Sequence, residues 1–175
     1  MKYCTVNKNY MTYLRKYDSR VPFTDYGENH YKPCLFPLFK VDDLVYVVHI
    51  TSPKAKHRHM GNSQDFKKIF IDTNRRKGRY YVGAINLNHM VPVPKEYLQK
   101  LDYRNIEKIR EFKNDKARSK YISLLKHELK SVNEMHIDKV ARKLYEFKNL
   151  KPESAVAKRC LDFKKLEKAA KLFNE

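Results

Sequence analysis

The chain has 175 residues, 42% of them hydrophobic, and carries a formal net charge of +18 from 38 Lys and Arg residues against 20 Asp and Glu. This length and apolar content exclude a disordered basic tail and predict a single domain over residues 1–175. The apolar runs are too short to cross a bilayer and three widely spaced cysteines do not make a disulfide framework, so we expect a cytoplasmic protein that binds no membrane.

The positive charge predicts a polyanionic partner. The excess is divided equally between residues 1–93 and 94–175, so basic surface belongs to both halves of the chain. A compact domain with this charge repels itself, and phosphate groups neutralise it well, which makes nucleic acid the expected partner. The alternative is a highly soluble basic protein that binds nothing.

Strand signals dominate the first half of the chain. Alternation predicts a short edge strand over residues 2–6, and Asn7 is placed to cap a helix of about ten residues. A loop is expected over residues 22–33. Apolar, β-branched and aromatic runs then predict two antiparallel hairpins and a short fifth strand, over residues 34–40 with 44–50, 68–72 with 79–86, and 90–93.

Helical periodicity takes over in the second half. Apolar stripes predict helices over residues 101–112, 121–132, 137–145 and 163–173. Asn133 and Asp162 are the expected N-caps of the last two helices, and Pro152 breaks the chain between them. Strands first and helices later predict an α+β fold, in which an antiparallel sheet is surrounded by helices mainly from the C-terminal half.

The segment that directly follows the most apolar strand is the first candidate site. It gathers hydroxyl, ammonium, guanidinium and imidazole groups within nine residues, namely Thr51, Ser52, Lys54, Lys56, His57, Arg58 and His59. Hydroxyl and ammonium groups are donors that grip phosphate, and Pro53 stiffens the turn. The segment therefore predicts a phosphate-binding turn, and the alternative interpretation is a solvated basic loop.

Two further basic runs are candidates for contact with RNA. One lies at the tip of the second hairpin and the other near the start of a helix: Arg75, Arg76, Lys77 and Arg79, and then Lys116, Arg118 and Lys120. Exposed basic tips suit phosphate backbones, and Tyr80 and Tyr81 offer rings on which unpaired bases stack. The alternative for the hairpin tip is a solvated turn, and the run near the helix is most simply a solvated helix face.

Neither a metal site nor a cofactor is expected. His57 and His59 are spaced to share one face of a strand, but no Cys-x-x-Cys or His-Glu-x-x-His motif accompanies them. The four glycines have no phosphate-loop spacing, and Ser52 lies in no Gly-x-Ser-x-Gly turn.

Several segments, in order along the chain, resemble one known family. They read YLRKYDSRVP at residues 13–22, ITSPK at 50–54, GAINLNHMVPV at 83–93 and, more weakly, CLDFKKLE at 160–167. This ordered set resembles the ToxN/AbiQ endoribonuclease toxins of bacterial type III toxin–antitoxin systems. The resemblance implies a twisted antiparallel sheet with a barrel-like core and helices around it.

The resemblance also implies an activity, partners and site residues. It implies metal-independent cleavage of cellular or phage RNA, inhibition by an antitoxin RNA of repeated pseudoknots, and assembly with that RNA into closed rings in the bacterial cytoplasm. Thr51, Ser52 and Lys54 fall on the family's active-site turn. Lys32 lies at the position of a second lysine, and Tyr26, in competition with Tyr31, corresponds to an upstream tyrosine.

The implied reaction is attack by a ribose 2′-OH on the adjacent phosphodiester, with Lys54 and the hydroxyls of Thr51 and Ser52 stabilising the phosphoryl oxygens. Lys32 would position phosphate or donate a proton. The general base remains open between Tyr26, His57 and Lys32. The alternative functions are a non-catalytic basic RNA-binding protein, a basic DNA-binding module and a metal-dependent nuclease.

Overall fold

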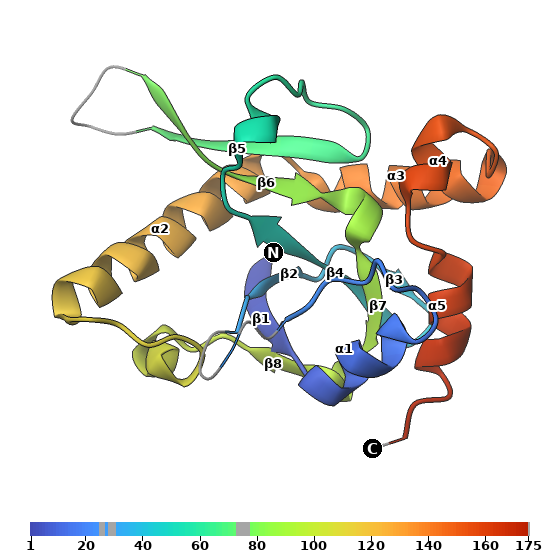
Figure 1. Cartoon of the computed structure of the whole chain (residues 1–175), viewed down its shortest axis with the longest axis horizontal. Helices are drawn as coiled ribbons and strands as arrows, with labels where there is room; N and C mark the ends of the chain where they lie inside the picture. Colours follow the sequence, from blue (N-terminus) through green and yellow to red (C-terminus); the bar gives the residue numbers. More distant parts are fainter. Residues whose placement is uncertain (25–26, 28–30, 73–77, 175) are drawn as a thin grey trace.

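The structure is a computed structural model that describes residues 1–24, 27, 31–72 and 78–174 (Figure 1). Tyr26, Arg75, Arg76 and Lys77 therefore lie outside the described residues. The fold is α+β, as expected, with an eight-stranded antiparallel sheet and helices mostly from the C-terminal half. The sheet is open, with the order β5-β6-β4-β2-β1-β8, while β3 and β7 pair with β4.

The strands follow the predicted runs closely. Their bounds are β1 Lys2–Val6, β2 Cys34–Phe36, β3 Lys40–Val41, β4 Leu44–Thr51, β5 Phe66–Asp72, β6 Arg79–Asn86, β7 Val91–Pro94 and β8 Leu98–Lys100. Both hairpins and the fifth strand are confirmed. The strand expected over 34–40 is divided in two at Pro37, which has no N–H to donate to a ladder.

The prediction that β1 is an edge strand is wrong. β1 pairs with β2 on one side and with β8 on the other, and β8 forms the edge. The three-residue β8 was not predicted, because so short a run carries no periodic signal. β4 lies inside the sheet, between β6 and β2, and its C-terminal end pairs with β6 through Ile50–Ile85 and Thr51–Ala84.

The helices are α1 Lys8–Arg15, α2 Asp115–Glu134, α3 Ile137–Leu150, α4 Ala155–Arg159 and α5 Phe163–Ala170. Asn7 and Asp162 cap α1 and α5 as predicted, each accepting from the third N–H beyond it. The predicted Asn133 cap is wrong, because Asn133 lies inside α2 and its side chain accepts from the amino terminus. The segment expected as a helix over 101–112 is a 3-10 helix over Tyr103–Lys108.

Helices on both sides of the sheet enclose the core. α2 packs on β5 along one side, while α5 packs on β7 and meets α1 on another (Figure 1). Tyr46 on β4 and Tyr145 on α3 both donate to Glu167 Oε1 on α5, at 2.8 and 2.7 Å. The three cysteines are free and buried. Within the described part of the chain, no helix has the length and apolar character needed to traverse a membrane.

Candidate active site

Two cavities lie against the C-terminal end of β4, one on each face of the strand. Side chains alternate between the faces of a strand, so His49 and Thr51 face one way while Ile50 faces the other. The alternation continues past the end of β4. Thr51 lines one cavity and Ser52 the other, each with a volume of about 520 Å³.

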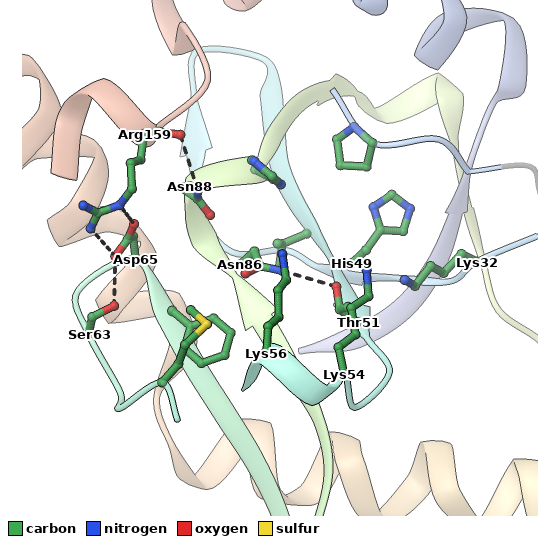
Figure 2. Close-up of a pocket in the computed structure, with 15 residues that line it drawn as sticks. Lys32, His49, Thr51, Lys54, Lys56, Ser63, Asp65, Asn86, Asn88 and Arg159 are labelled. Carbon is green, nitrogen blue, oxygen red and sulfur yellow. Dashed lines mark hydrogen bonds and ion pairs between the residues drawn. The ribbon is translucent and has the colours of Figure 1, made fainter. Parts of the chain in front are cut away.

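The first cavity, which we call the basic cavity, is rich in cationic and amide groups. Its lining is Pro22, Lys32, Val48, His49, Thr51, Lys54, Lys56, Met60, Ser63, Asp65, Phe66, Asn86, Asn88, His89 and Arg159. Lys32 reaches toward Thr51 from one side and Lys56 from the other (Figure 2). Three of the residues expected at the catalytic turn or before the first hairpin, Lys32, Thr51 and Lys54, therefore meet around one cavity.

Backbone hydrogen bonds hold Lys32 in place, and its surroundings lower the pKa of its ammonium group. Its N–H donates to the Thr24 carbonyl at 2.9 Å, and the preceding N–H of Tyr31 donates to Ile109 O at 2.8 Å. Burial, followed by the nearby Lys54 ammonium, lowers the pKa of Lys32. A lysine with a lowered pKa releases a proton more readily than an exposed one.

Two histidines that the sequence did not assign to the site also line the basic cavity. Burial, assisted by the Lys32 charge, lowers the pKa of His49 to about 3, and its Nε2 lies 3.1 Å from Cys34 Sγ. His49 is therefore neutral at pH 7. Burial and the charge of Arg20 also lower the pKa of His89. Strand alternation relative to Thr51 was the signal that could have placed His49 here.

Amide and carboxylate groups fix one wall of the basic cavity. Asn86 Nδ2 donates to Thr51 Oγ1 at 3.3 Å, and Asn88 Nδ2 donates to the Arg159 carbonyl at 3.3 Å (Figure 2). Arg159 binds Asp65 through two hydrogen bonds of 2.9 and 3.1 Å, and Ser63 donates to the same carboxylate. These contacts connect the loop after β4 to α4. The local sequence pattern does not predict them, because the partners are distant in the sequence.

The second cavity, which we call the aromatic cavity, lies between the turn after β4 and helix α2. It is lined by Tyr3, Tyr31, Lys32, Pro33, Ile50, Ser52, Pro53, Val82, Ile109, Arg110, Tyr121, Leu124, Leu125 and Glu128. Lys32 is common to both cavities. The predicted Ser52 thus faces a different cavity from Thr51, because successive side chains of an extended segment diverge.

His57 is a correction to the expected RNA-contacting residues. Its side chain is only 2% exposed, its Nδ1 lies 2.8 Å from the Tyr81 hydroxyl, and its ring packs on Phe66. His59, by contrast, is exposed. No group of three or more His, Cys, Asp or Glu side chains in the described ranges is arranged to hold a metal ion.

Arg118, another expected RNA contact, is partly exposed and also has a structural role. Its guanidinium forms an ion pair with Glu107 and donates to the carbonyls of Tyr103 and Arg104, so it holds the Tyr103–Lys108 segment against α2. The other described candidates for RNA contact are exposed, with Lys56 also lining the basic cavity: Lys56, Arg58, His59, Arg79, Lys116 and Lys120.

The family model described as "Toxin ToxN, type III toxin-antitoxin system" matches residues 2–171. The chain belongs to the ToxN toxin family. A relative with this name, Endoribonuclease ToxN of Bacillus thuringiensis subsp. kurstaki, is 34% identical over 101 residues. That match covers 58% of this chain and 47% of the relative, so the chain spans about half the length of the curated ToxN that it matches.

Solved structures related to the ToxN family share the fold across almost the whole chain. One comes from a bacterial type III toxin–antitoxin system in which a non-coding RNA pseudoknot selectively inhibits the toxin. Its chain is 25% identical to this one, and the two superpose with a TM-score of 0.76 over 97% of this chain and 95% of that chain. Another is AbiQ, a lactococcal anti-phage endoribonuclease, which is 22% identical, with a TM-score of 0.76 over 98% and 96% of the two chains.

Proposed function

We propose that this chain is a metal-independent endoribonuclease toxin and that the basic cavity is its active site. The observation that carries the proposal is the meeting of Lys32, Thr51 and Lys54 around one cavity of about 520 Å³. Two ammonium groups and a hydroxyl in that arrangement suit a phosphodiester and its developing negative charge. Family membership supports the same activity.

The reaction is an internal transesterification. The ribose 2′-oxygen forms a bond to phosphorus while the bond from phosphorus to the 5′-oxygen breaks, leaving a 2′,3′-cyclic phosphate and a 5′-hydroxyl. One proton leaves the 2′-hydroxyl for a base, and one is delivered to the departing 5′-oxygen. Lys54 and the Thr51 hydroxyl donate to the phosphoryl oxygens, where preorganised donors have the largest effect.

Lys32 is the group best suited to proton transfer among the described residues of the basic cavity. Burial lowers its pKa and so makes proton transfer easier than it is for an exposed lysine, whereas His49, with a pKa of about 3, holds its proton too weakly to act as an acid. His57 is occupied with Tyr81, which disfavours it as the base. Lys32 and Tyr26 remain the candidates for base and acid.

The exposed cations around the basic cavity would bind the antitoxin RNA as well as substrate. Arg58 and His59 follow the catalytic turn, and Lys56 lines the cavity itself. Phosphate contacts give such binding its affinity, and unpaired bases stacked on aromatic side chains add to it. We propose that a pseudoknot RNA inhibits the toxin in the bacterial cytoplasm and assembles with it into closed rings.

The test compares the wild-type chain with Lys54→Ala, which removes one donor from an exposed turn, and with Lys139→Ala, which removes the same charge from an exposed site on α3. We expect growth arrest and new RNA 5′-hydroxyl ends with the wild type and Lys139→Ala, and a loss on the order of 10²–10³ in cleavage rate with Lys54→Ala. Cleavage should persist in EDTA and stop when the sugar at the cut is 2′-deoxy.

The alternative is a non-catalytic RNA-binding protein that uses the same cations. It predicts binding without new RNA ends, and a toxicity that Lys54→Ala weakens no more than Lys139→Ala does. A wild-type protein that is toxic but leaves every cellular RNA intact would establish this alternative and reject the endoribonuclease.

A further inference from the structure

The aromatic cavity has the character of a site for a flat, partly apolar ligand. Ile50 and Val82 from the sheet and Leu124 and Leu125 from α2 give it apolar walls. A volume of about 520 Å³ is ample for a nucleobase and its sugar. Such pockets, with apolar walls and a few fixed polar groups, are typical of small-ligand sites.

Stacking surfaces line the same cavity. The Arg110 guanidinium lies 4.6 Å from the centroid of the Tyr121 ring, and both residues line the cavity. Phe112, outside the lining, packs on Tyr121 with a centroid distance of 5.5 Å. Tyr31 contributes a further ring to the lining. Aromatic rings and arginine planes are the surfaces on which proteins stack unpaired bases.

The Glu128 carboxylate is placed to accept hydrogen bonds from a ligand inside this largely apolar cavity. Glu128 is 6% exposed and accepts a hydrogen bond of 3.0 Å from the Tyr3 hydroxyl through Oε2. Oε1 accepts no hydrogen bond from the residues that the structure describes. It lies 3.5 Å from where a Cβ on Gly83 would stand, so the glycine leaves room beside it.

The aromatic cavity adjoins the proposed site of cleavage. Lys32 lines both cavities, and Ser52 in the aromatic cavity directly follows Thr51 in the basic cavity. A phosphate bound at Lys32 and Lys54 would therefore bring the base of a neighbouring nucleotide to the entrance of the aromatic cavity.

We propose that the aromatic cavity holds the unpaired base next to the cleaved phosphate and that Glu128 selects bases with an exocyclic amino group over uracil. This inference rests on the proposed function. Adenine, cytosine and guanine each present an amino group that donates to a carboxylate oxygen. Uracil can donate to a carboxylate only through its ring N3–H, which lies between two carbonyl oxygens, and these acceptors are repelled by the carboxylate in a space with little water.

The test uses Glu128→Gln and the matched Glu134→Gln, which removes the same charge from an exposed site on the same helix. The side-chain amide introduced by Glu128→Gln keeps an oxygen for Tyr3 and gains a donor for the uracil carbonyl. Short RNAs that differ only in the base on either side of the cut are assayed for kcat/KM at pH 8. This pH keeps Glu128 ionised, since burial raises its pKa to about 7.

The wild type and Glu134→Gln should disfavour uracil at one of the two flanking positions by about 10-fold or more, in line with the cost of a mismatched base contact. Glu128→Gln should reduce that preference to about 3-fold or less. Equal cleavage of all four bases by the wild type, or a preference unchanged in Glu128→Gln, overturns the inference.

Binding is measured in parallel with the same RNAs made uncleavable by a 2′-deoxy sugar at the cut. The four RNAs should have the same order of affinities as of cleavage rates. If no RNA is cut, the proposed function is rejected, and these affinities still test the base preference. A second variant, Tyr121→Leu, should weaken binding of every RNA about 5-fold or more through lost stacking while the bias against uracil persists. Unchanged binding by Tyr121→Leu would also overturn the inference.

Discussion

Asn86 Nδ2 donates a hydrogen bond of 3.3 Å to Thr51 Oγ1, so the last residue of β6 orients the last residue of β4 (Figure 2). The two strands pair directly beside this contact, through Thr51 and Ala84. A hydroxyl on a rigid strand end, oriented by a neighbouring amide, loses little freedom when it binds a phosphate.

Removing the Asn86 amide should therefore lower activity without changing the fold. We expect Asn86→Ala to reduce kcat/KM for a short RNA by about 3- to 10-fold, the equivalent of one net hydrogen bond. The measurement is a steady-state cleavage assay beside a thermal melt. Asn174→Ala, at an exposed position far along the chain, is the control and should match the wild type. Full activity in Asn86→Ala would show that Thr51 needs no such orientation.

Gly83 on β6 lets the end of β4 pack closely against it. A Cβ at this position would lie 2.9 Å from Ile50 Cγ2 and 3.1 Å from the Thr51 carbonyl, so the end of β4 would have to shift. Gly83→Ala should cost about 1–3 kcal/mol of unfolding free energy and reduce cleavage as well. Urea denaturation measures the first and the RNA assay the second. Gly61→Ala has no atom within 4 Å of its new Cβ and should be neutral in both.

The ion pair of Arg159 with Asp65 should hold the loop after β4 in place. Asp65 is 4% exposed, so Arg159→Met leaves a buried carboxylate without its main partner. We expect a loss of about 1–3 kcal/mol of unfolding free energy, toward the lower end because the Arg159 side chain is about half exposed. Arg104→Met, which breaks an ion pair whose arginine is 91% exposed, should change the unfolding free energy much less. Equal effects of the two variants would contradict a structural role for the buried pair.

Glu128 should make stability depend on pH. Burial raises its pKa from 4.5 to about 7 against the opposing effects of the Tyr3 hydrogen bond and the Lys32 charge. Between these values the unfolded chain releases the proton first, so the native state binds more protons and the unfolding free energy falls as pH rises. Below about pH 4.5 the penalty is absent, and above about pH 7 it is complete.

From pH 4.5 to 8 the wild type should therefore lose about 2–3 kcal/mol relative to Glu128→Gln. Chemical denaturation of both proteins across this range gives the difference directly. The buried His49 has the opposite pH dependence, since its pKa is lowered to about 3, but it is common to both proteins and cancels. A difference that stays constant with pH would contradict a raised pKa for Glu128.

Local signals account for much of the fold. The hairpin of β5 with β6 and the caps Asn7 and Asp162 were predictable because each depends on neighbours within a few residues. Asn133 has the residue type of a cap, but the α2 helix continues through it and its side chain binds the amino terminus instead. Tertiary contacts over long separations override such local preferences.

The site was predictable only in part. The turn after β4 was found from its donors and from the family resemblance, and strand alternation accounts for Ser52 and Thr51 facing different ways, but only the packing of α2 made the second cavity that Ser52 lines. Glu128 carries no local signal at all, because its partner Tyr3 lies 125 residues away in the sequence. The sequence predicted that His57 is an exposed RNA contact, but its ring packs against Tyr81 and Phe66.

The sequence by itself determined the charge, the succession of strands and helices, and the presence of hydroxyl and ammonium donors at residues 51–54, since these follow from composition and from contacts between near neighbours. Only the tertiary structure decided that Lys32 would join Thr51 and Lys54 and that Glu128 would sit behind them. These juxtapositions arise from the order of strands in the sheet and the packing of α2, and burial acts on side chains only once those distant segments meet.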